Sequence, residues 1–589
     1  MKKTRPAPRP GLGGVRGRPE LRLRVGFIVI AMVLSVFGAR LVQMQGLDPK
    51  AIAARAAQEG TVEVTLPAQR GDIVDRNGTP LADSVTGKMV VADPSRTRDV
   101  APELATLLST ELDVDYFSTL KALRVSDRRW SAVARRVPST KAADVLEKVE
   151  EAGFTGVTTE PDPVRSYPAK DVAANLVGFI GTDEALGGLE RTFNTYLAGK
   201  DGSSSYQVGS GYRIPTGEST VVKARDGKTL TTTLDRDLQW FAQRELGEAV
   251  DAAGADSGSL VVLDSRTSEV LTVADYPSYD ASDPLLADKE DLGARSLTDA
   301  YEPGSVAKVL TFASLIDAGK ITPRTPFKVP AKLMRQDRPI GDWFDHDTIK
   351  LTATGVLAKS SNIGTVLAAD KFSTQEMWDY FDAFGLGHRT DIGVRGETRG
   401  IFPPASAISS QSKDRMVFGQ SMSVNALQMA AAVNTIANGG VHVDPSLIRG
   451  SATTEDGTVV GTDQATTRRV VSTKAARQTA RMMERVTHEG AGVAPAAQVP
   501  GYRVAGKTGT AQRVDAECQC YRGTSLSFGG FAPADDPRFT VYVVIHNPSN
   551  GGGGGSTAGP VFSRVLGYAL SRYRVPPTGT KPSKLPVEW

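Results

Sequence analysis

Residues 301–308 place a serine and a lysine at the spacing that nucleophilic catalysis needs. Pro303 and Gly304 predict a turn, and the apolar residues that follow recur at helical spacing, so Ser305 should begin a buried helix. Residues three apart share a helix face, which places the Lys308 amine one turn from the Ser305 hydroxyl. A buried lysine with a lowered pKa can take the serine proton. The helix N-terminus adds N–H groups that could hold a developing oxyanion.

The Ser-x-x-Lys pattern alone is a weak signal. Residues 410–413 repeat it as Ser-Gln-Ser-Lys, but an Asp-Arg pair follows where an apolar helix is required. Ser-x-Asn occurs at 360–362 and again at 423–425, whereas Lys-Thr-Gly occurs only at 507–509. Order, spacing and context together favour residues 305–308, 360–362 and 507–509 over chance matches to short patterns.

Three of these residues are the catalytic candidates. Ser305 is the predicted nucleophile, Lys308 is its base, and Ser360 could relay a proton between Lys308 and a leaving group. Lys507 is predicted to add positive charge, which favours the neutral form of Lys308 and attracts an anionic substrate.

Four further residues are predicted to bind the substrate together with Lys507. Asn362 would hydrogen-bond a substrate amide, while Thr508 and Thr510 would hydrogen-bond a carboxylate. Gly509 lies in an expected edge strand, where an extended peptide could pair and the missing side chain permits a close approach.

Composition and charge exclude several other functions. The chain has 589 residues and a net charge of +3, and its length indicates more than one domain. Residues 1–24 carry eight basic side chains and one acidic one, so the remainder has a net charge of −4 and gives no reason to expect nucleic-acid binding. The five histidines are scattered without metal-ligand spacing, so we expect neither a metal nor a cofactor.

The two cysteines, Cys518 and Cys520, are one residue apart. Outside the cytoplasm they could close a small disulfide, or they could bind nothing. Zinc binding is not expected, because no second Cys or His pair stands at ligand spacing.

An uncharged apolar run covers residues 25–39 and extends past Arg40 through further apolar residues. We interpret residues 25–45 as a single transmembrane anchor, with the basic tail before it in the cytoplasm and the rest of the chain outside. The alternative is a cleaved signal peptide, since the length also suits its apolar segment.

The elements that must position the candidate residues lie on both sides of a predicted domain boundary near residues 226–227, where the sequence pattern changes. Before it, the pattern predicts a helix at 47–58, a strand at 62–66, a hairpin at 70–78 whose charged residues pair with one another, and exposed hairpins or a connector at 199–227. After it, the predicted strands are 229–234, 258–264, 269–274, 524–532 and 539–546, and the predicted helices include 235–246 and 560–573. The glycine run 551–555 predicts a flexible surface loop, and the proline-rich tail from residue 576 is expected to be frayed.

The three short motifs together resemble the signature of penicillin-binding proteins and serine β-lactamases. The resemblance reaches further, to the marks of class B penicillin-binding proteins, at residues 70–78, 188–190, 396–397 and 419–421. It implies an α+β protein with one N-terminal transmembrane helix, an extended α+β pedestal domain and a transpeptidase domain whose antiparallel sheet is sandwiched by helices. The implied domains are residues 1–24, a basic cytoplasmic tail; 25–45, the anchor; 46–227, the non-catalytic pedestal; 228–575, the transpeptidase domain; and 576–589, a proline-rich tail.

The resemblance also implies a reaction. Ser305 would attack the D-Ala-D-Ala bond of a peptidoglycan stem peptide, with the backbone N–H groups of Ser305 and Thr510 as the oxyanion hole, and the acyl-enzyme would transfer to an amine of a neighbouring strand. β-Lactam antibiotics would inhibit it. No part of residues 46–227 resembles a glycosyltransferase, so a separate membrane glycosyltransferase and other cell-division proteins are the expected partners.

Within class B, the sequence of residues 301–308 and the short C-terminus look most like those of the division-specific septal enzyme. The elongation-specific enzyme is the alternative. Two other classes remain as hypotheses. A penicillin-recognising sensor should carry several membrane spans and a cytoplasmic effector domain, and a scaffold without turnover should have lost part of the catalytic set.

Overall fold

The computed structural model describes residues 19–43, 60–126, 128–181, 184–209, 212–213, 219–336, 338–515, 518 and 520–589. The chain divides into two compact units: a first unit of Met1–Leu66 with Asp201–Ala224, and a second unit of Pro67–Lys200 with Arg225–Trp589. The helix predicted at 47–58 lies outside the described residues.

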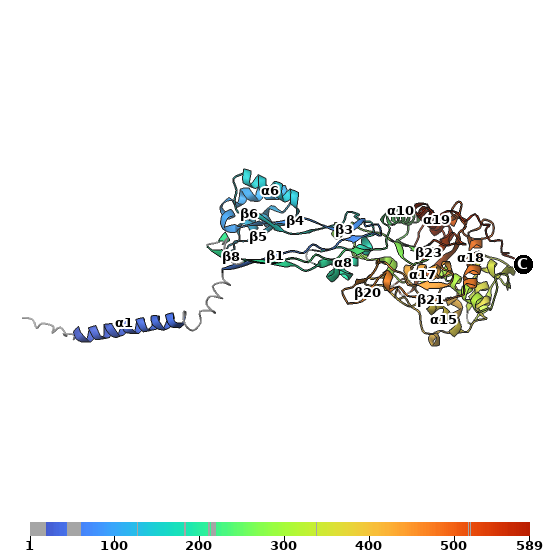
Figure 1. Cartoon of the computed structure of the whole chain (residues 1–589). Coiled ribbons are helices and arrows are strands. Elements are labelled where there is room, and N and C mark those ends of the chain that lie inside the picture. Colours follow the sequence, from blue (N-terminus) through green and yellow to red (C-terminus); the bar gives the residue numbers. More distant parts are fainter. Residues whose placement is uncertain are drawn as a thin grey trace, which may run out of the picture. The chain divides into compact units, whose positions relative to one another are not determined.

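The first unit contains helix α1 and a small antiparallel sheet. Helix α1 covers Pro19–Val42, and an 18-residue window within it has a mean hydropathy of 2.4, with none of that window buried by protein (Figure 1). At about 1.5 Å per residue, this helix is long enough to cross the hydrocarbon core of a bilayer. In the sheet, β8 (Gly202–Gly209) pairs with β1 (Thr61–Leu66), β9 (Tyr212–Arg213) and β10 (Ser219–Val222). The strand predicted at 62–66 and the hairpins predicted within 199–227 are therefore confirmed.

The second unit begins with a pedestal that has its own small core. Its central strand β4 (Gly87–Ala92) pairs with β5 (Ser131–Pro138) and β6 (Val157–Pro161). Helices α4 (Ala101–Leu112), α5 (Tyr116–Arg124) and α6 (Ser139–Glu151) supply the other side of this core. Their buried residues, such as Leu104, Leu108 and Val145, fall on the helix face that the apolar periodicity predicts.

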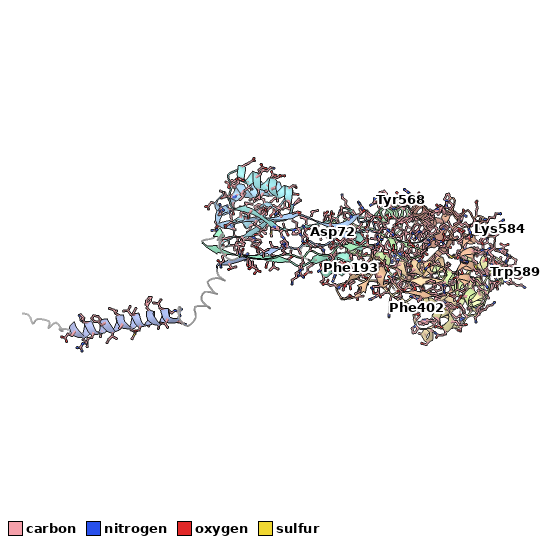
Figure 2. All side chains as sticks on the ribbon, in the orientation of Figure 1. Asp72, Phe193, Phe402, Tyr568, Lys584 and Trp589 are labelled. Carbon is pink, nitrogen blue, oxygen red and sulfur yellow. A yellow bond between two sulfur atoms is a disulfide. The ribbon has the colours of Figure 1, made fainter. Side chains whose placement is uncertain are left out.

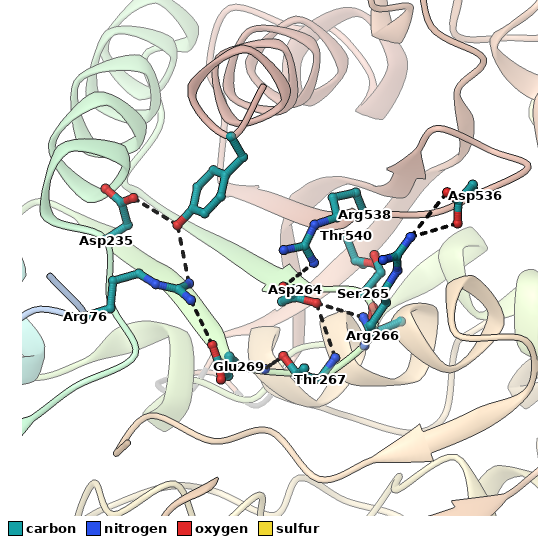
Figure 3. Close-up of polar contacts among 12 residues, drawn as sticks. Arg76, Asp235, Asp264, Ser265, Arg266, Thr267, Glu269, Asp536, Arg538 and Thr540 are labelled. Atoms are coloured by element: carbon teal, nitrogen blue, oxygen red, sulfur yellow. Dashed lines mark hydrogen bonds and ion pairs between the residues drawn. The ribbon is translucent and has the colours of Figure 1, made fainter. Parts of the chain in front are cut away.

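The hairpin predicted at residues 70–78 is present as β2 (Ile73–Val74) and β3 (Pro80–Val85), with Gly78 at a φ of 83° in the turn. The prediction that its charged residues pair with one another is wrong. Arg76 reaches across to Glu269, at 3.1 Å, and to the hydroxyl of Tyr573 (Figure 3). Asp75 instead accepts hydrogen bonds from the backbone N–H groups of Asn77 and Thr79 in its own turn. These donors stabilise the buried carboxylate.

A five-stranded antiparallel sheet forms the centre of the second unit, in the order β13-β12-β24-β23-β22. The strands are β12 (Ser257–Asp264), β13 (Val270–Tyr276), β22 (Ala505–Asp515), β23 (Cys520–Ala532) and β24 (Phe539–His546). Helices α10 (Arg236–Ala253) and α19 (Gly559–Arg572) lie on one side of β23, and α17 (Ala426–Ala437) lies on the other (Figure 1). The predicted helix-covered antiparallel sheet is confirmed.

Shorter elements surround this sheet. In the pedestal they are α3 (Pro94–Thr97), β7 (Val164–Ser166), α7 (Ala174–Val177), α8 (Gly188–Thr192) and α9 (Asn194–Ala198), with β11 (Leu230–Thr231) pairing β2. Around the five-stranded sheet they are α11 (Arg295–Thr298), α12 (Lys308–Asp317), β14 (Pro326–Val329), β15 (Leu333–Arg335), β16 (Arg338–Ile340), β17 (Ile349–Thr352), α13 (Ala353–Lys359), α14 (Asn362–Ala369), α15 (Thr374–Ala383) and α16 (Ser410–Met416). Further along the chain they are β18 (Val441–Val443), β19 (Ala452–Thr453), β20 (Val459–Val460), β21 (Thr467–Arg469) and α18 (Thr473–Thr487).

The C-terminal tail is ordered, so the prediction that it is frayed is wrong. The backbone N–H of Thr352 donates to Val587 O at 2.9 Å, and the Trp589 indole donates to Phe327 O at 3.3 Å. A side chain at Gly355 would stand only 1.9 Å from Val587 O, so glycine there lets the tail lie flat on α13. Figure 2 shows the labelled Trp589 against the second unit, at the end farthest from Asp72.

Candidate active site

The turn that carries Ser305 is held by the loop that contains Gly419. Ser305 lies in a 3-10 turn, Gly304–Ala307, that leads directly into α12. Gly304 has a φ of 57° and donates its N–H to Gly419 O at 2.9 Å, and a Cβ on Gly419 would collide with Gly304 O. The prediction that Ser305 begins a buried helix is confirmed, with the difference that the first turn is tighter than an α-turn and the α-helix starts at Lys308.

Lys308 is completely buried in the floor of the site. Its Nζ donates to Ser360 O at 2.7 Å and to Asn362 Oδ1 at 2.8 Å, and lies 3.4 Å from Ser360 Oγ. Ser360 and Asn362 of the Ser-x-Asn motif therefore hold the Lys308 amine, which the sequence analysis places one helical turn from Ser305.

Lys507 is also completely buried and approaches the same serine from the opposite side. Its Nζ donates to Ser360 Oγ, to Thr508 O and to Thr508 Oγ1, each at 2.9 Å. The Ser360 hydroxyl thus lies between two lysine amines, where it can pass a proton from one to the other.

Burial controls the protonation of both amines. It lowers the pKa of Lys308 to about 7, against a smaller opposing effect of the Asp342 carboxylate. Burial and the nearby Lys308 charge lower the pKa of Lys507 well below its ordinary value. Because the Lys308 charge disfavours protonation of Lys507, we expect the two amines together to carry at most one positive charge, that is one extra proton, near neutral pH.

Ser360 has a backbone conformation that points it between the lysines. It caps the C-terminus of α13 at a φ of 60°, in the left-handed region that non-glycine residues seldom adopt. Ser361 then caps the N-terminus of α14 by accepting a hydrogen bond from the N–H of Gly364. The break between the two helices places Asn362 at the start of α14 with its side chain toward Lys308.

Asp342 is a residue of this site that the sequence analysis missed. Its side chain is fully buried and accepts hydrogen bonds from the N–H groups of Asn362 and Ile363, at 2.6 and 3.0 Å, and from the Ser361 hydroxyl at 2.6 Å. His346 Nε2 lies 3.1 Å from the same carboxylate. Asp342 therefore anchors the N-terminus of α14, where a negative charge is favourable. It follows β16 without any local pattern that marks it.

Gly509 packs closely against the turn that carries Ser305. β22 is an edge strand of the sheet, as predicted. A Cβ on Gly509 would lie 2.1 Å from Ser527 Oγ and 3.0 Å from both Pro303 O and the Val306 side chain. The glycine lets β22 lie directly against the turn that carries Ser305, so it sets the distance between the two halves of the site.

The predicted residues meet at a cleft of about 530 Å³. Its lining includes Ser305, Ser360, Asn362, Thr508 and Thr510, while Lys308 and Lys507 are buried at its base. The structure adds lining residues that the sequence analysis did not assign to the site: Trp343, Phe418, Gln420, Val493 and residues 552–556.

The glycine run is part of this cleft, so its prediction as a flexible surface loop is wrong. Residues Gly554–Ala558 form a π-helical turn, and Gly554 and Gly555 are buried. A Cβ on Gly554 would lie 2.3 Å from Ser527 O and 2.4 Å from Gly509 O. A chain segment that packs this closely on a strand backbone requires glycine.

The second Ser-x-x-Lys and Ser-x-Asn matches have structural roles elsewhere. Ser410 is exposed at the start of α16, and the Lys413 amine donates to Phe372 O. Asn425 caps α17 in a capping box with Gln428. These second matches therefore have local structural roles in α16 and α17.

Cys518 and Cys520 form a disulfide, one of the two alternatives that the sequence left open. It lies at the end of the β22–β23 hairpin, next to Tyr521, whose hydroxyl donates to Glu302 Oε1 at 3.0 Å. In the described part of the chain, no group of three or more His, Cys, Asp or Glu side chains is placed to hold a metal ion.

Comparison with known proteins gives a consistent result. Residues 258–567, half of the chain, match the family described as the penicillin binding protein transpeptidase domain, and residues 65–232 match the penicillin-binding protein dimerisation domain. Penicillin-binding protein PbpB of Mycolicibacterium smegmatis is 34% identical over 94% of this chain and 91% of its own length. Peptidoglycan D,D-transpeptidase FtsI of Escherichia coli is 30% identical over 93% of this chain and 91% of its own length.

Solved structures are similar over nearly the whole chain. Penicillin binding protein 3 of Mycobacterium tuberculosis, complexed with ampicillin, has 29% sequence identity and a TM-score of 0.70, covering 89% of this chain and 100% of that one. A peptidoglycan synthetase of Bifidobacterium adolescentis has 28% identity and a TM-score of 0.71, covering 90% of this chain and 100% of that one.

Proposed function

This chain belongs to the penicillin-binding protein transpeptidases, and we propose that it cross-links peptidoglycan stem peptides through an acyl-enzyme at Ser305. The observation that carries the proposal is the convergence of two fully buried lysines on the Ser360 hydroxyl, at the base of a cleft that Ser305 lines. Among the described residues no carboxylate contacts either amine, and such burial is costly; a site with a catalytic role is where such a cost is retained.

Proton transfer follows from the shared proton of the lysine pair. A substrate carboxylate bound by Thr508 and Thr510 would raise the pKa of Lys507 and draw that proton to its Nζ through the Ser360 hydroxyl. Lys308 is then neutral and can accept the proton of Ser305 Oγ as that oxygen attacks the carbonyl carbon of the D-Ala-D-Ala bond. Substrate binding thus produces the base.

The remaining groups hold the substrate and its transition state. The N–H groups of Ser305 and Thr510 form the proposed oxyanion hole, and Asn362 binds a substrate amide. The edge of β22 pairs with the extended donor peptide. When the D-alanine leaves, its nitrogen takes a proton from the Lys308–Ser360 pair, and an amine from a second strand then attacks the ester carbonyl.

The proposed domain organisation follows the sequence analysis. Residues 1–24 are a cytoplasmic tail, 25–45 the membrane anchor, 46–227 the pedestal, 228–575 the transpeptidase domain and 576–589 the tail. The long exposed apolar helix α1 and the basic residues before it support a single-pass protein with its catalytic domain outside the cytoplasm.

We assign the activity to septal wall synthesis, since relatives that align over most of this chain include FtsI and PbpB. The proposed partners are a membrane glycosyltransferase, which supplies the glycan strands, and other division proteins. Depletion in cells checks this assignment. Filaments or chains are the expected result, whereas rounded cells would assign the chain to elongation.

Labelling of the full-length protein with a fluorescent penicillin tests the chemistry. We expect covalent labelling of the wild type and of Ser410→Ala, whose serine belongs to the second Ser-x-x-Lys match. Ser305→Ala should not be labelled. Labelling that survives Ser305→Ala would refute the assignment of Ser305 as the nucleophile. A labelled protein that never transfers its acyl group to an amine would be a sensor.

A further inference from the structure

A second hollow adjoins the catalytic cleft, and the reaction described above does not use it. It encloses about 670 Å³, within the range of ligand-binding pockets, and it shares Trp343 and Val493 with the cleft. We call it the tail groove, because Glu588 and Trp589 of the C-terminal tail form one of its walls. The two hollows are therefore adjacent, with Trp343 and Val493 in the wall of both.

The aromatic walls of the tail groove are fixed in place while their faces stay open to solvent. The Trp343 indole N–H donates to Lys359 O at 2.9 Å, and the Trp589 indole N–H donates to Phe327 O. Trp343 nevertheless remains 67% exposed and Trp589 51% exposed. A tryptophan that is anchored by its N–H and shows its ring to solvent is typical of a binding surface.

The charges of the groove favour an anionic ligand. Lys350 and Lys359 both line it, against Glu588 as the one acidic residue among its lining residues. The Lys350 ammonium lies 5.5 Å above the Trp589 ring, so cation and ring form a single contact surface. Lys359 directly precedes Ser360, which connects this surface to the catalytic groups.

We propose that the tail groove binds the acceptor strand of the cross-linking reaction, an anionic stem peptide that carries the attacking amine. The inference rests on the proposed transpeptidase function. While the donor acyl group occupies the cleft along β22, the amine must reach the Ser305 ester from another direction, and the tail groove adjoins the cleft at Trp343 and Val493. Carboxylates of the strand meet Lys350 and Lys359, and its apolar parts lie on the two indole rings.

The transfer step is balanced without any further reactant. The acceptor nitrogen forms a bond to the ester carbonyl carbon, and the bond from that carbon to Ser305 Oγ breaks. The proton that the amine loses returns to Ser305 Oγ through Lys308. The products are a new amide and the free serine, so the groove has only to position the amine.

Separate measurement of acylation and transfer tests the proposal on the full-length protein in detergent. Acylation is followed with penicillin, and transfer from a thioester donor is followed with two acceptors: a synthetic stem peptide that bears an amine, and a single D-amino acid too small to fill the groove. Lys350→Glu reverses a groove charge, and Lys332→Glu makes the same change at an exposed lysine outside the groove. We expect Lys350→Glu to raise the KM for the stem peptide by about tenfold, with acylation and transfer to the D-amino acid unchanged.

A second pair of variants tests the aromatic wall. Trp589→Ala removes it, and Trp240→Ala is the matched control, because both indoles are 51% exposed. Trp589→Ala should also raise the stem-peptide KM by about tenfold, while Trp240→Ala should not. If Trp589→Ala impairs transfer equally with both acceptors, the tail only supports α13 and the proposal is overturned. An unchanged stem-peptide KM in Lys350→Glu would also overturn it. A wild type that penicillin never acylates would instead refute the transpeptidase function itself.

Discussion

The pedestal and the catalytic cleft both bury charged side chains, and they do so in opposite ways. In the pedestal, the fully buried Glu190 accepts from Arg165 at 2.6 Å and from Arg70 at 2.7 Å. In the cleft, Lys308 and Lys507 share the neutral hydroxyl of Ser360. The pedestal cluster combines opposite charges, whereas the cleft brings two like charges together.

This difference shows where the fold gains stability and where it loses it. Arg70 also donates to Glu190 O and to Asn194, so the pedestal cluster compensates most of what its charges lose on leaving water. In the described part of the chain the two lysines donate to neutral oxygens and contact no carboxylate, and the pKa of each falls below that of a free lysine. A lowered pKa is what a catalytic base requires, so the cleft trades stability for reactivity.

The largest expected effect is that of Lys308→Met, which removes one of the two like charges. Acylation by penicillin should fall by about 10²- to 10⁴-fold, since the base is lost. At the same time the protein should gain about 1–3 kcal/mol of unfolding free energy, because a buried amine becomes an apolar side chain of similar length. Penicillin labelling rates and chemical denaturation in detergent measure the two effects.

The sign of this gain depends on pH. The folded pKa of Lys308, about 7, lies below the unfolded value of 10.5, so the unfolded state binds more protons between them. The buried Lys308 amine therefore lowers the unfolding free energy of the wild type most below pH 7. This destabilisation disappears as pH rises toward 10.5. The gain from Lys308→Met should be larger at pH 6 than at pH 10, and a gain independent of pH would contradict the buried-amine explanation.

Glu190→Gln makes the opposite change in the pedestal. It leaves Arg70 and Arg165 without their shared carboxylate, and the loss of one partner from a buried ion cluster costs about 3–5 kcal/mol. The melting temperature should fall markedly. The folded fraction should still react with penicillin at the wild-type rate, because the side-chain partners of Glu190 are Arg70, Arg165 and Tyr167 of the pedestal. Glu111→Gln, at a half-exposed pair with Lys148, is the control and should change stability by less than about 1 kcal/mol.

The sequence was sufficient for the features that local patterns encode. The Ser305 turn, the break at Ser360 and the strand of Lys507 each carry their own signal in caps, glycines and apolar periodicity. Their order along the chain then separated them from the second matches at Ser410 and Asn425. Strands of the central sheet such as β12 and β24 carry apolar runs that predicted them, whereas their assembly into a helix-covered antiparallel sheet was implied by the family resemblance.

The features that the sequence did not predict depend on contacts between distant segments. Asp342 is one acidic residue among several in its loop, and only the fold places it beneath Asn362, twenty residues later. The tail lies on β17 although more than two hundred residues separate Thr352 from Val587. A run of glycines predicts freedom of the backbone, but at Gly554 the same missing side chains permit tight packing on Gly509.

The pH dependence of wild-type acylation should show the lysine pair directly. In the proposed mechanism the base is neutral Lys308 and the reacting pair holds one extra proton, so the rate should fall by about tenfold for each pH unit below the point at which both lysines are protonated. On the alkaline side, the shared proton is lost from the pair and binding of an anionic substrate should weaken. The two apparent pKa values belong to the pair rather than to either lysine. A rate that stays flat between pH 5 and 8 would remove Lys308 from the role of base.

Asp342→Asn is the smallest change and the sharpest test of the cleft. The Asp342 charge raises the pKa of Lys308, in opposition to burial. Its neutralisation should therefore move the acid limb of the acylation profile to lower pH, by less than about one unit. An asparagine oxygen can still accept from the N–H groups of Asn362 and Ile363, so the start of α14 should remain in place. If the limb moves to higher pH, or if the rate falls equally at all pH values, Asp342 acts on the position of Asn362 and not on the charge of Lys308.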